Sequence, residues 1–99
     1  MELKIQSIHF DASEKLQEFI QKKIAKIEKN SDDIRSAEVV LKVVKPEVAM
    51  NKETAIRLRV PSGELYAEKV CDTFEEGVDL CVEALQKQLS KYKEKLRGR

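Results

Sequence analysis

Lysines are the side chains in this sequence whose type and spacing point most clearly to chemistry, and they form two rows. The first row lies in residues 14–30 and consists of Lys15, Lys22, Lys26 and Lys29, with Lys23 at its edge. The second row consists of Lys87, Lys91 and Lys95 at i, i+4 and i+8. Ammonium groups held in rows on rigid helices can bind the phosphates of a nucleic acid.

Both rows border apolar positions that recur every three or four residues, which predicts two amphipathic helices. The apolar positions of residues 72–99 are Phe74, Val78, Cys81, Leu85, Leu89, Tyr92 and Leu96. The first half of this segment is acidic, with Asp72, Glu75, Glu76, Asp79 and Glu83. An acidic start and a basic end also suit the helix macrodipole, so a purely structural interpretation of the charges stays open.

Composition limits the other classes of function. The 99 residues are 41% apolar, which suffices for one core, and we expect a single domain over residues 1–99. The net charge is only +1 although 37% of the residues are charged, so nucleic-acid binding depends on where the lysines lie. No apolar run is long enough to cross a bilayer and no signal peptide is recognisable, so we expect a cytoplasmic chain without a membrane partner.

Catalytic and metal-binding groups are scarce. Cys71 and Cys81 are ten residues apart and lie far in sequence from the single His9, a spacing that fits neither a zinc site nor a redox dithiol. Cys81 is expected to be a small buried apolar residue, and His9 a polar strand residue. We therefore expect no enzyme, no cofactor, no metal and no small-molecule substrate.

Periodicity and turn residues predict six elements. We expect a strand over residues 2–10 with a bulge near Gln6 and Ser7, and then a helix to about Asn30, capped by Asp11 or Ser13. Glu14 would complete a capping box with Asp11. A turn cluster at residues 30–33 precedes a strand over residues 34–45, which Pro46 ends.

The second half of the chain predicts a hairpin and a last helix. Residues 54–60 and 65–71 alternate as strands around a tight turn in which Gly63 can adopt positive φ. The last helix then runs from Thr73 to Leu96. Since this helix is longer than a strand, its end should overhang the sheet, with Leu85 in the core and Leu96 near the edge.

The order strand, helix, three strands, helix predicts an α+β fold, a two-layer sandwich with a four-stranded sheet and two helices on one face. The first two strands should be parallel, joined by the helical crossover. The outer sheet face would meet water through Glu38, Lys42, Arg57, Arg59 and Glu68. With both helices on one face, the lysine rows could approach each other across or beside the groove between them.

Lysine rows of this kind favour a structured RNA recognised through its backbone, because lysine acts as a point charge and gives no base specificity. Few aromatic residues are available for stacking on bases. The candidate RNA-binding residues are Lys22, Lys23, Lys26, Lys29, Lys87, Lys91 and Lys95.

Three segments and the first helix resemble the ribosome hibernation promoting factors, also called ribosome-associated inhibitors or sigma-54 modulation proteins, in their short form. The segments are residues 39–45 (VVLKVVK), 63–67 (GELYA) and 85–96 (LQKQLSKYKEKL). In the first helix the matching residues are Leu16, Glu18, Phe19, Lys23, Ala25, Lys26 and Glu28. The resemblance covers nearly the whole chain.

The resemblance implies a fold similar to the double-stranded-RNA-binding domain, and a non-enzymatic role. It implies binding to 16S rRNA in the decoding cleft of the small ribosomal subunit, where mRNA and the A-site and P-site tRNAs lie, and hence inhibition of translation. The residues carried over as rRNA contacts are Lys23, Lys26, Lys87, Lys91 and Lys95.

The chain departs from this family at two places. Ala84 stands where many relatives have lysine, and the junction at residues 68–74 is short and differs from the family's aromatic-containing form. A protein-interaction module that modulates a transcription factor, sigma-54, remains the alternative function. The sequence also leaves open weak self-association and whether ribosomes are silenced singly or joined in pairs.

Overall fold

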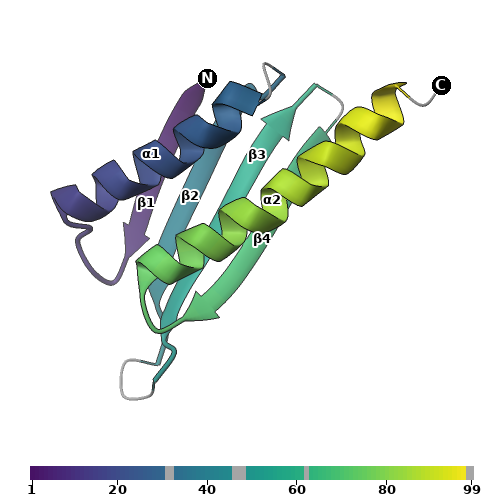
Figure 1. The fold of residues 1–99 in the computed structure, drawn as a ribbon. Coiled ribbons are helices and arrows are strands. Elements are labelled where there is room, and N and C mark those ends of the chain that lie inside the picture. Colours follow the sequence, from purple (N-terminus) through teal and green to yellow (C-terminus); the bar gives the residue numbers. More distant parts are fainter. Residues whose placement is uncertain (31–32, 46–48, 62, 98–99) are drawn as a thin grey trace.

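A computed structural model describes residues 1–30, 33–45, 49–61 and 63–97. The elements are β1 (Glu2–Ile8), α1 (Glu14–Asn30), β2 (Ser36–Val43), β3 (Lys52–Val60), β4 (Gly63–Cys71) and α2 (Phe74–Arg97). Both helices lie on one face of the four-stranded sheet, α1 over β1 and β2 and α2 over β3 and β4 (Figure 1). This confirms the predicted α+β sandwich of two layers and its element order.

The sheet follows the order of the chain, β1-β2-β3-β4. β1 pairs parallel with β2, as the crossover through α1 predicts, and the other two pairings are antiparallel. The register places Glu2 beside Ser36, Ser36 beside Arg59 and Arg59 beside Glu64. Alternate residues of each strand therefore share one face, in rows that cross all four strands.

The core lies between the sheet and the helices. On α1 its buried side chains are Leu16, Ile20, Ile24 and Ile27, and on α2 they include Val78, Cys81, Leu85 and Leu89. The sheet contributes Ala37, Val39, Leu41, Ile56, Leu58 and Val60 among others. Phe19 of α1 is only partly buried, at the margin of this cluster.

The end of β1 differs from the prediction. The pairing with β2 runs without interruption from Glu2 to Ile8, so the expected bulge at Gln6 and Ser7 is wrong. The apolar alternation changes phase between Ile5 and Ile8, which suggested the bulge. The apparent shift at the end of the segment arises because the strand ends at Ile8 and His9 adopts a φ of 72°. That turn lets Phe10 stack on Phe74, with ring centroids 4.7 Å apart. His9 is therefore a turn residue and not a strand residue.

Ser13 begins α1. Its Oγ accepts a hydrogen bond from the Leu16 amide at 3.1 Å, and its carbonyl accepts one from the Gln17 amide. Of the two N-caps proposed from the sequence, Ser13 is therefore the one observed, and a capping box starting at Asp11 is not formed. The cap satisfies an amide that the helix itself leaves without a partner.

Replacing Ser13 with alanine should lower the free energy of unfolding by about 1 kcal/mol, because the Leu16 amide loses its acceptor. Ser90→Ala is the matched control, since Ser90 is exposed within α2 and alanine is the better helix former. Urea denaturation of both variants measures the difference. An equal effect of the two changes would contradict the capping role.

α2 begins after Thr73, whose Oγ1 accepts from the Glu76 amide at 3.1 Å. One turn into the helix, Gly77 is buried directly against β3. A Cβ atom at Gly77 would lie 2.5 Å from Oγ1 of Thr54, which is itself fully buried. The glycine therefore permits the close approach of α2 to the sheet.

The turn between β3 and β4 is confirmed in one respect, because Gly63 has a φ of 152°, a region that favours glycine. Several other expectations fall outside the described residues: residues 31 and 32 of the turn cluster, the role of Pro46 in ending a strand, and Ser62 in the turn. The side chain of Leu96 also lies outside them. In Figure 1 the last turns of α2 extend past the edge of the sheet where β3 ends and β4 begins, which agrees with the predicted overhang.

Candidate nucleic-acid interface

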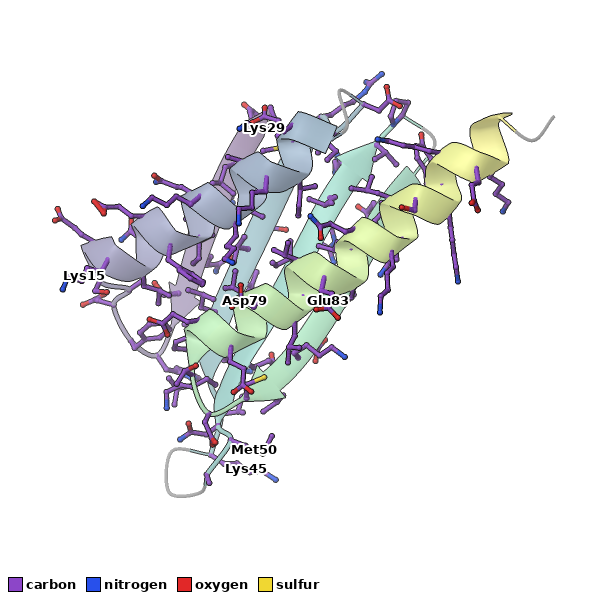
Figure 2. All side chains as sticks on the ribbon, in the orientation of Figure 1. Lys15, Lys29, Lys45, Met50, Asp79 and Glu83 are labelled. Carbon is purple, nitrogen blue, oxygen red and sulfur yellow. The ribbon has the colours of Figure 1, made fainter. Side chains whose placement is uncertain are left out.

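The lysines of α1 lie on the solvent side of the helix layer. Lys22, Lys26 and Lys29 are exposed and recur at steps of four and three, which places them on one side of the helix. Figure 2 shows Lys15 and Lys29 at opposite ends of α1, so the row runs along the whole helix. None of these four lysines forms an ion pair within the described part of the chain.

Lys23 differs from its neighbours. Its Nζ lies 2.7 Å from a carboxylate oxygen of Asp79 on α2 and 5.3 Å from the centre of the Phe19 ring, and its side chain is only 26% exposed. The ammonium charge is thus compensated inside the molecule and links the two helices. Of the lysines that the sequence proposed for RNA, Lys23 is the least available to a phosphate.

Two contacts fix the orientation of α2. Asp79 faces α1 through Lys23, whereas the Gln88 side-chain amide donates to the Tyr66 carbonyl of β4 at 2.8 Å. Lys91 and Lys95 follow Gln88 by three and seven residues, so they lie on the same flank of the helix as Gln88. This flank faces away from α1. The two lysine rows therefore share the helix layer but do not line a common groove, contrary to one of the arrangements considered from the sequence.

The groove side of α2 carries a cation that the sequence reasoning missed. Gln86, Leu89, Ser90 and Lys93 line a hollow of about 430 Å³ on this helix. Lys93 is half-buried and follows Gln86 by seven residues, which puts it on the side of α2 that Asp79 also occupies. The seven-residue spacing between Gln86 and Lys93 could have predicted this position of Lys93. The sequence prediction instead followed the regular row of Lys87, Lys91 and Lys95.

Charge along α2 changes from acidic to basic, as the sequence predicted. Asp79 and Glu83 lie in the first half of the helix (Figure 2), while the lysines follow Glu83. Lys87 lies 3.9 Å from Glu83, but both side chains are more than two-thirds exposed, so this pair contributes little to stability. A polyanion would be attracted to the C-terminal halves of the helices and repelled from the start of α2.

Aromatic side chains are not presented on the helix layer. Phe10, Phe19, Phe74 and Tyr92 are buried or half-buried, and Tyr66 is exposed on the opposite face of the sheet. The layer therefore offers charges to a phosphate backbone and no platform for stacked bases. Ala84 is half-buried and packs against the core on the flank of α2 that carries Lys91.

The thiols and carboxylates give no reactive centre in the described residues. No group of three or more His, Cys, Asp or Glu side chains there could hold a metal ion. Both cysteines are free and buried. Burial raises the pKa of Cys81 to about 11, and its thiol donates to the Thr54 carbonyl. Burial likewise raises the pKa of Cys71, so neither thiol is activated as a nucleophile.

The raised pKa of Cys81 predicts a pH dependence of stability. The folded chain binds the thiol proton more tightly than the unfolded chain does, so its contribution is complete below pH 9.0 and is lost as pH rises toward about 11. The free energy of unfolding should fall over this range by more in the natural chain than in Cys81→Ala. Urea titrations of both at a series of pH values test this, and parallel pH profiles would contradict it.

Within the described residues, neither helix has an apolar stretch of the length and composition needed to span a membrane.

Comparison with known proteins identifies relatives along almost the whole chain. Over 97 residues the chain is 33% identical to the ribosome hibernation promoting factor of Escherichia coli, covering 98% of each chain, and over 95 residues it is 27% identical to that of Pseudomonas putida, covering 96% of this chain and 89% of the relative.

Among solved structures, a ribosomal subunit interface protein from Coxiella burnetii superposes with a TM-score of 0.84 at 27% identity, covering 94% of this chain and 98% of that one. The N-terminal domain of Protein Y from Thermus thermophilus shares the fold, with a TM-score of 0.78 at 20% identity over 93% of this chain and 99% of that one. The sequence profile described as sigma 54 modulation protein / S30EA ribosomal protein matches residues 3–97. With this match over nearly its full length, the chain belongs to the sigma 54 modulation protein / S30EA ribosomal protein family.

Proposed function

We propose that the chain is a non-enzymatic ribosome hibernation factor. It binds the small ribosomal subunit through 16S rRNA in the decoding cleft, in the region of mRNA and the A-site and P-site tRNAs, and so inhibits translation in the cytoplasm. The observation that carries this proposal is the lysine-bearing helix layer, together with relatives named ribosome hibernation promoting factor.

The helix layer suits a folded RNA for electrostatic reasons. Lys22, Lys26 and Lys29 on α1, and Lys91 and Lys95 on α2, form no ion pair in the described part of the chain, so their charges can replace the counterions of phosphates. The rigid helices fix the spacing of these charges. Recognition then rests on the shape of the RNA backbone, since bases are neither stacked nor read by arginine forks.

Replacing Lys26, Lys29 and Lys91 with glutamine should reduce the slope of log affinity against log salt by about two to three, because each lysine neutralises one phosphate. Lys23 and Lys87 are left unchanged because carboxylates already lie beside them. Fluorescence titrations of small subunits at several salt concentrations give the slope. Sedimentation with ribosomes and translation in vitro should show less binding and less inhibition for the same variant.

The matched control removes the same number of positive charges from the opposite face, with Lys4→Gln, Lys42→Gln and Arg59→Gln together. Both variants have the same net charge, so only the position of the lost charges differs. The control should keep the salt slope of the natural chain. Equal loss in the two variants would mean that net charge alone drives binding, and an unchanged slope in the helix-layer variant would exclude the proposed RNA surface.

The family description favours one second candidate, modulation of sigma-54. This function needs a protein surface and not a phosphate-binding layer. It would be supported if purified sigma-54 retained the chain with a shallow salt dependence while small subunits did not. Retention by small subunits alone would exclude it.

A further inference from the structure

The sheet face opposite the helices is uncovered in the described part of the chain, and its residues form four ordered rows. Each row takes one outward residue from β1, β2, β3 and β4 in turn. The rows are Glu2, Ser36, Arg59 and Glu64; then Lys4, Glu38, Arg57 and Tyr66; then Gln6, Val40, Ala55 and Glu68; and then Ile8, Lys42, Glu53 and Val70. We call this surface the outer face.

Charges on the outer face are held in place by one another. Arg57 lies 3.3 Å from Glu38 and 3.5 Å from Glu64, and its guanidinium carbon is 5.6 Å from the centre of the Tyr66 ring. The Tyr66 hydroxyl donates to Glu68 at 2.8 Å, which raises the pKa of Tyr66. The basic and acidic side chains of the four rows nearly balance. The outer face therefore has no excess of positive charge that would attract a polyanion, in contrast to the helix layer.

We propose that a second copy of this chain is the partner of the outer face. The two copies pack outer face to outer face about a two-fold axis that lies between the two sheets. This axis runs parallel to the strands, midway between β2 and β3. Across such an axis each row faces the same row of the second copy, with β1 opposite β4 and β2 opposite β3. Lys42 then faces Glu53 of the second copy, and Glu38 faces Arg57. By symmetry each pair occurs twice.

Three further facing pairs match as well. Val40 faces Ala55 of the second copy and Ile8 faces Val70, so apolar groups meet beside the charged pairs. Tyr66, which is 44% exposed, faces Lys4, an arrangement that suits a cation over an aromatic ring. Lys4 also lines a hollow of about 230 Å³ on the outer face, which offers space for that ring.

One row fits poorly, since Glu2 would face Glu64 of the second copy. This row lies at the end of the sheet, where the angle of about 30° between packed sheets separates opposing positions most. An axis perpendicular to the strands fits worse. It would set Arg57 against Ala55 and Glu38 against Val40, so these central charges would keep only the ion pairs within their own chain and gain no partner from the second copy. Charge complementarity therefore selects the axis along the strands.

The expected dimer is weak. Four strands about 4.8 Å apart and seven residues long at about 3.3 Å each give roughly 450 Å² of flat sheet per copy. Two such faces bury about 900 Å², which is in the range of transient contacts and below that of permanent ones. Both helix layers would point outward in the dimer, so self-association leaves the lysine rows free.

The test uses Lys42→Glu and Glu53→Lys as separate variants and as a mixture. Each variant alone sets like charges against each other across the interface, so sedimentation velocity at increasing concentration should show monomers only. In a one-to-one mixture both contacts join opposite charges, and dimers should return with at least the affinity of the natural chain. Melting curves establish that each variant is folded, and the double variant Lys42→Glu with Glu53→Lys provides a second check because it should dimerise by itself.

The matched control uses Lys87→Glu and Glu83→Lys, which break a charge pair on the helix layer. Each of these variants should associate like the natural chain. The proposal is overturned if the natural chain stays monomeric up to millimolar concentration, if the mixture of outer-face variants stays monomeric, or if the helix-layer variants lose association to the same extent. Ribosome binding is not involved, so the outcome is independent of the proposed function.

Discussion

Replacing Leu85 with alanine is expected to lower the free energy of unfolding by about 2 to 5 kcal/mol, the largest effect of any single change considered. Leu85 is fully buried in the middle of α2 and belongs to the core cluster between helices and sheet. Its removal leaves a cavity between α2 and the strands that the neighbouring residues can fill only in part. Urea denaturation followed by circular dichroism gives the difference.

Leu80→Ala is the matched control for this change. Leu80 lies on the same helix, and the substitution has the same effect on helix propensity, but its side chain is 38% exposed. Its loss should cost well under half as much as that of Leu85. If the two variants were equally destabilised, the core would not be centred on the face of α2 that carries Leu85.

The second large effect is expected at Gly77. Alanine there gains about 1 kcal/mol in helix propensity over glycine, so an exposed helix would be stabilised. At Gly77 the added methyl group would lie 2.5 Å from Oγ1 of Thr54, a distance at which either the buried Thr54 side chain or the packing of α2 on β3 must shift. Overpacking of this kind should outweigh the gain, with a net loss of about 1 to 3 kcal/mol in the free energy of unfolding.

A double-mutant cycle with Thr54→Ala isolates this contact. The hydroxyl of Thr54 is buried and has no hydrogen-bond partner among the described residues, so its removal leaves no partner unsatisfied. Without Oγ1, the nearest atom to the new methyl group is the Cβ atom at 3.1 Å, and Gly77→Ala should then cost much less. A cost that is unchanged by Thr54→Ala would refute the steric explanation.

The elements could be predicted because each is encoded locally. Steps of three and four mark both helices, alternation marks the strands, and Gly63 marks the hairpin turn. The bulge prediction failed for a different reason. A single residue, His9, adopts a left-handed backbone conformation, and no periodicity encodes that change. The resulting position of Phe10 gives the sequence the same apolar pattern that a β-bulge within the strand would give.

The lysine surface was only partly predictable, because the relation between two helices depends on how each is rotated against the sheet. The rotation of α2 follows from Asp79 on one flank and Gln88 on the other, contacts made with α1 and β4. These are pairings between segments distant in sequence. Consequently Lys23 was assigned to RNA although Asp79 compensates its charge, and Lys93 was overlooked. Whether the remaining lysines bind rRNA is a prediction that the salt experiment decides.

The strand order has a consequence for how the chain acquires its structure. Since neighbours in the sheet are also neighbours along the chain, β2, β3 and β4 can form by successive hairpin closure, and only β1 requires a long connection, through α1, to reach its place. Short closures cost less chain entropy than long ones. We therefore expect the meander with α2 to form the folding nucleus. β1 is an edge strand like β4, but it alone depends on the long connection, so it should join last and exchange its amide protons earliest among the strands.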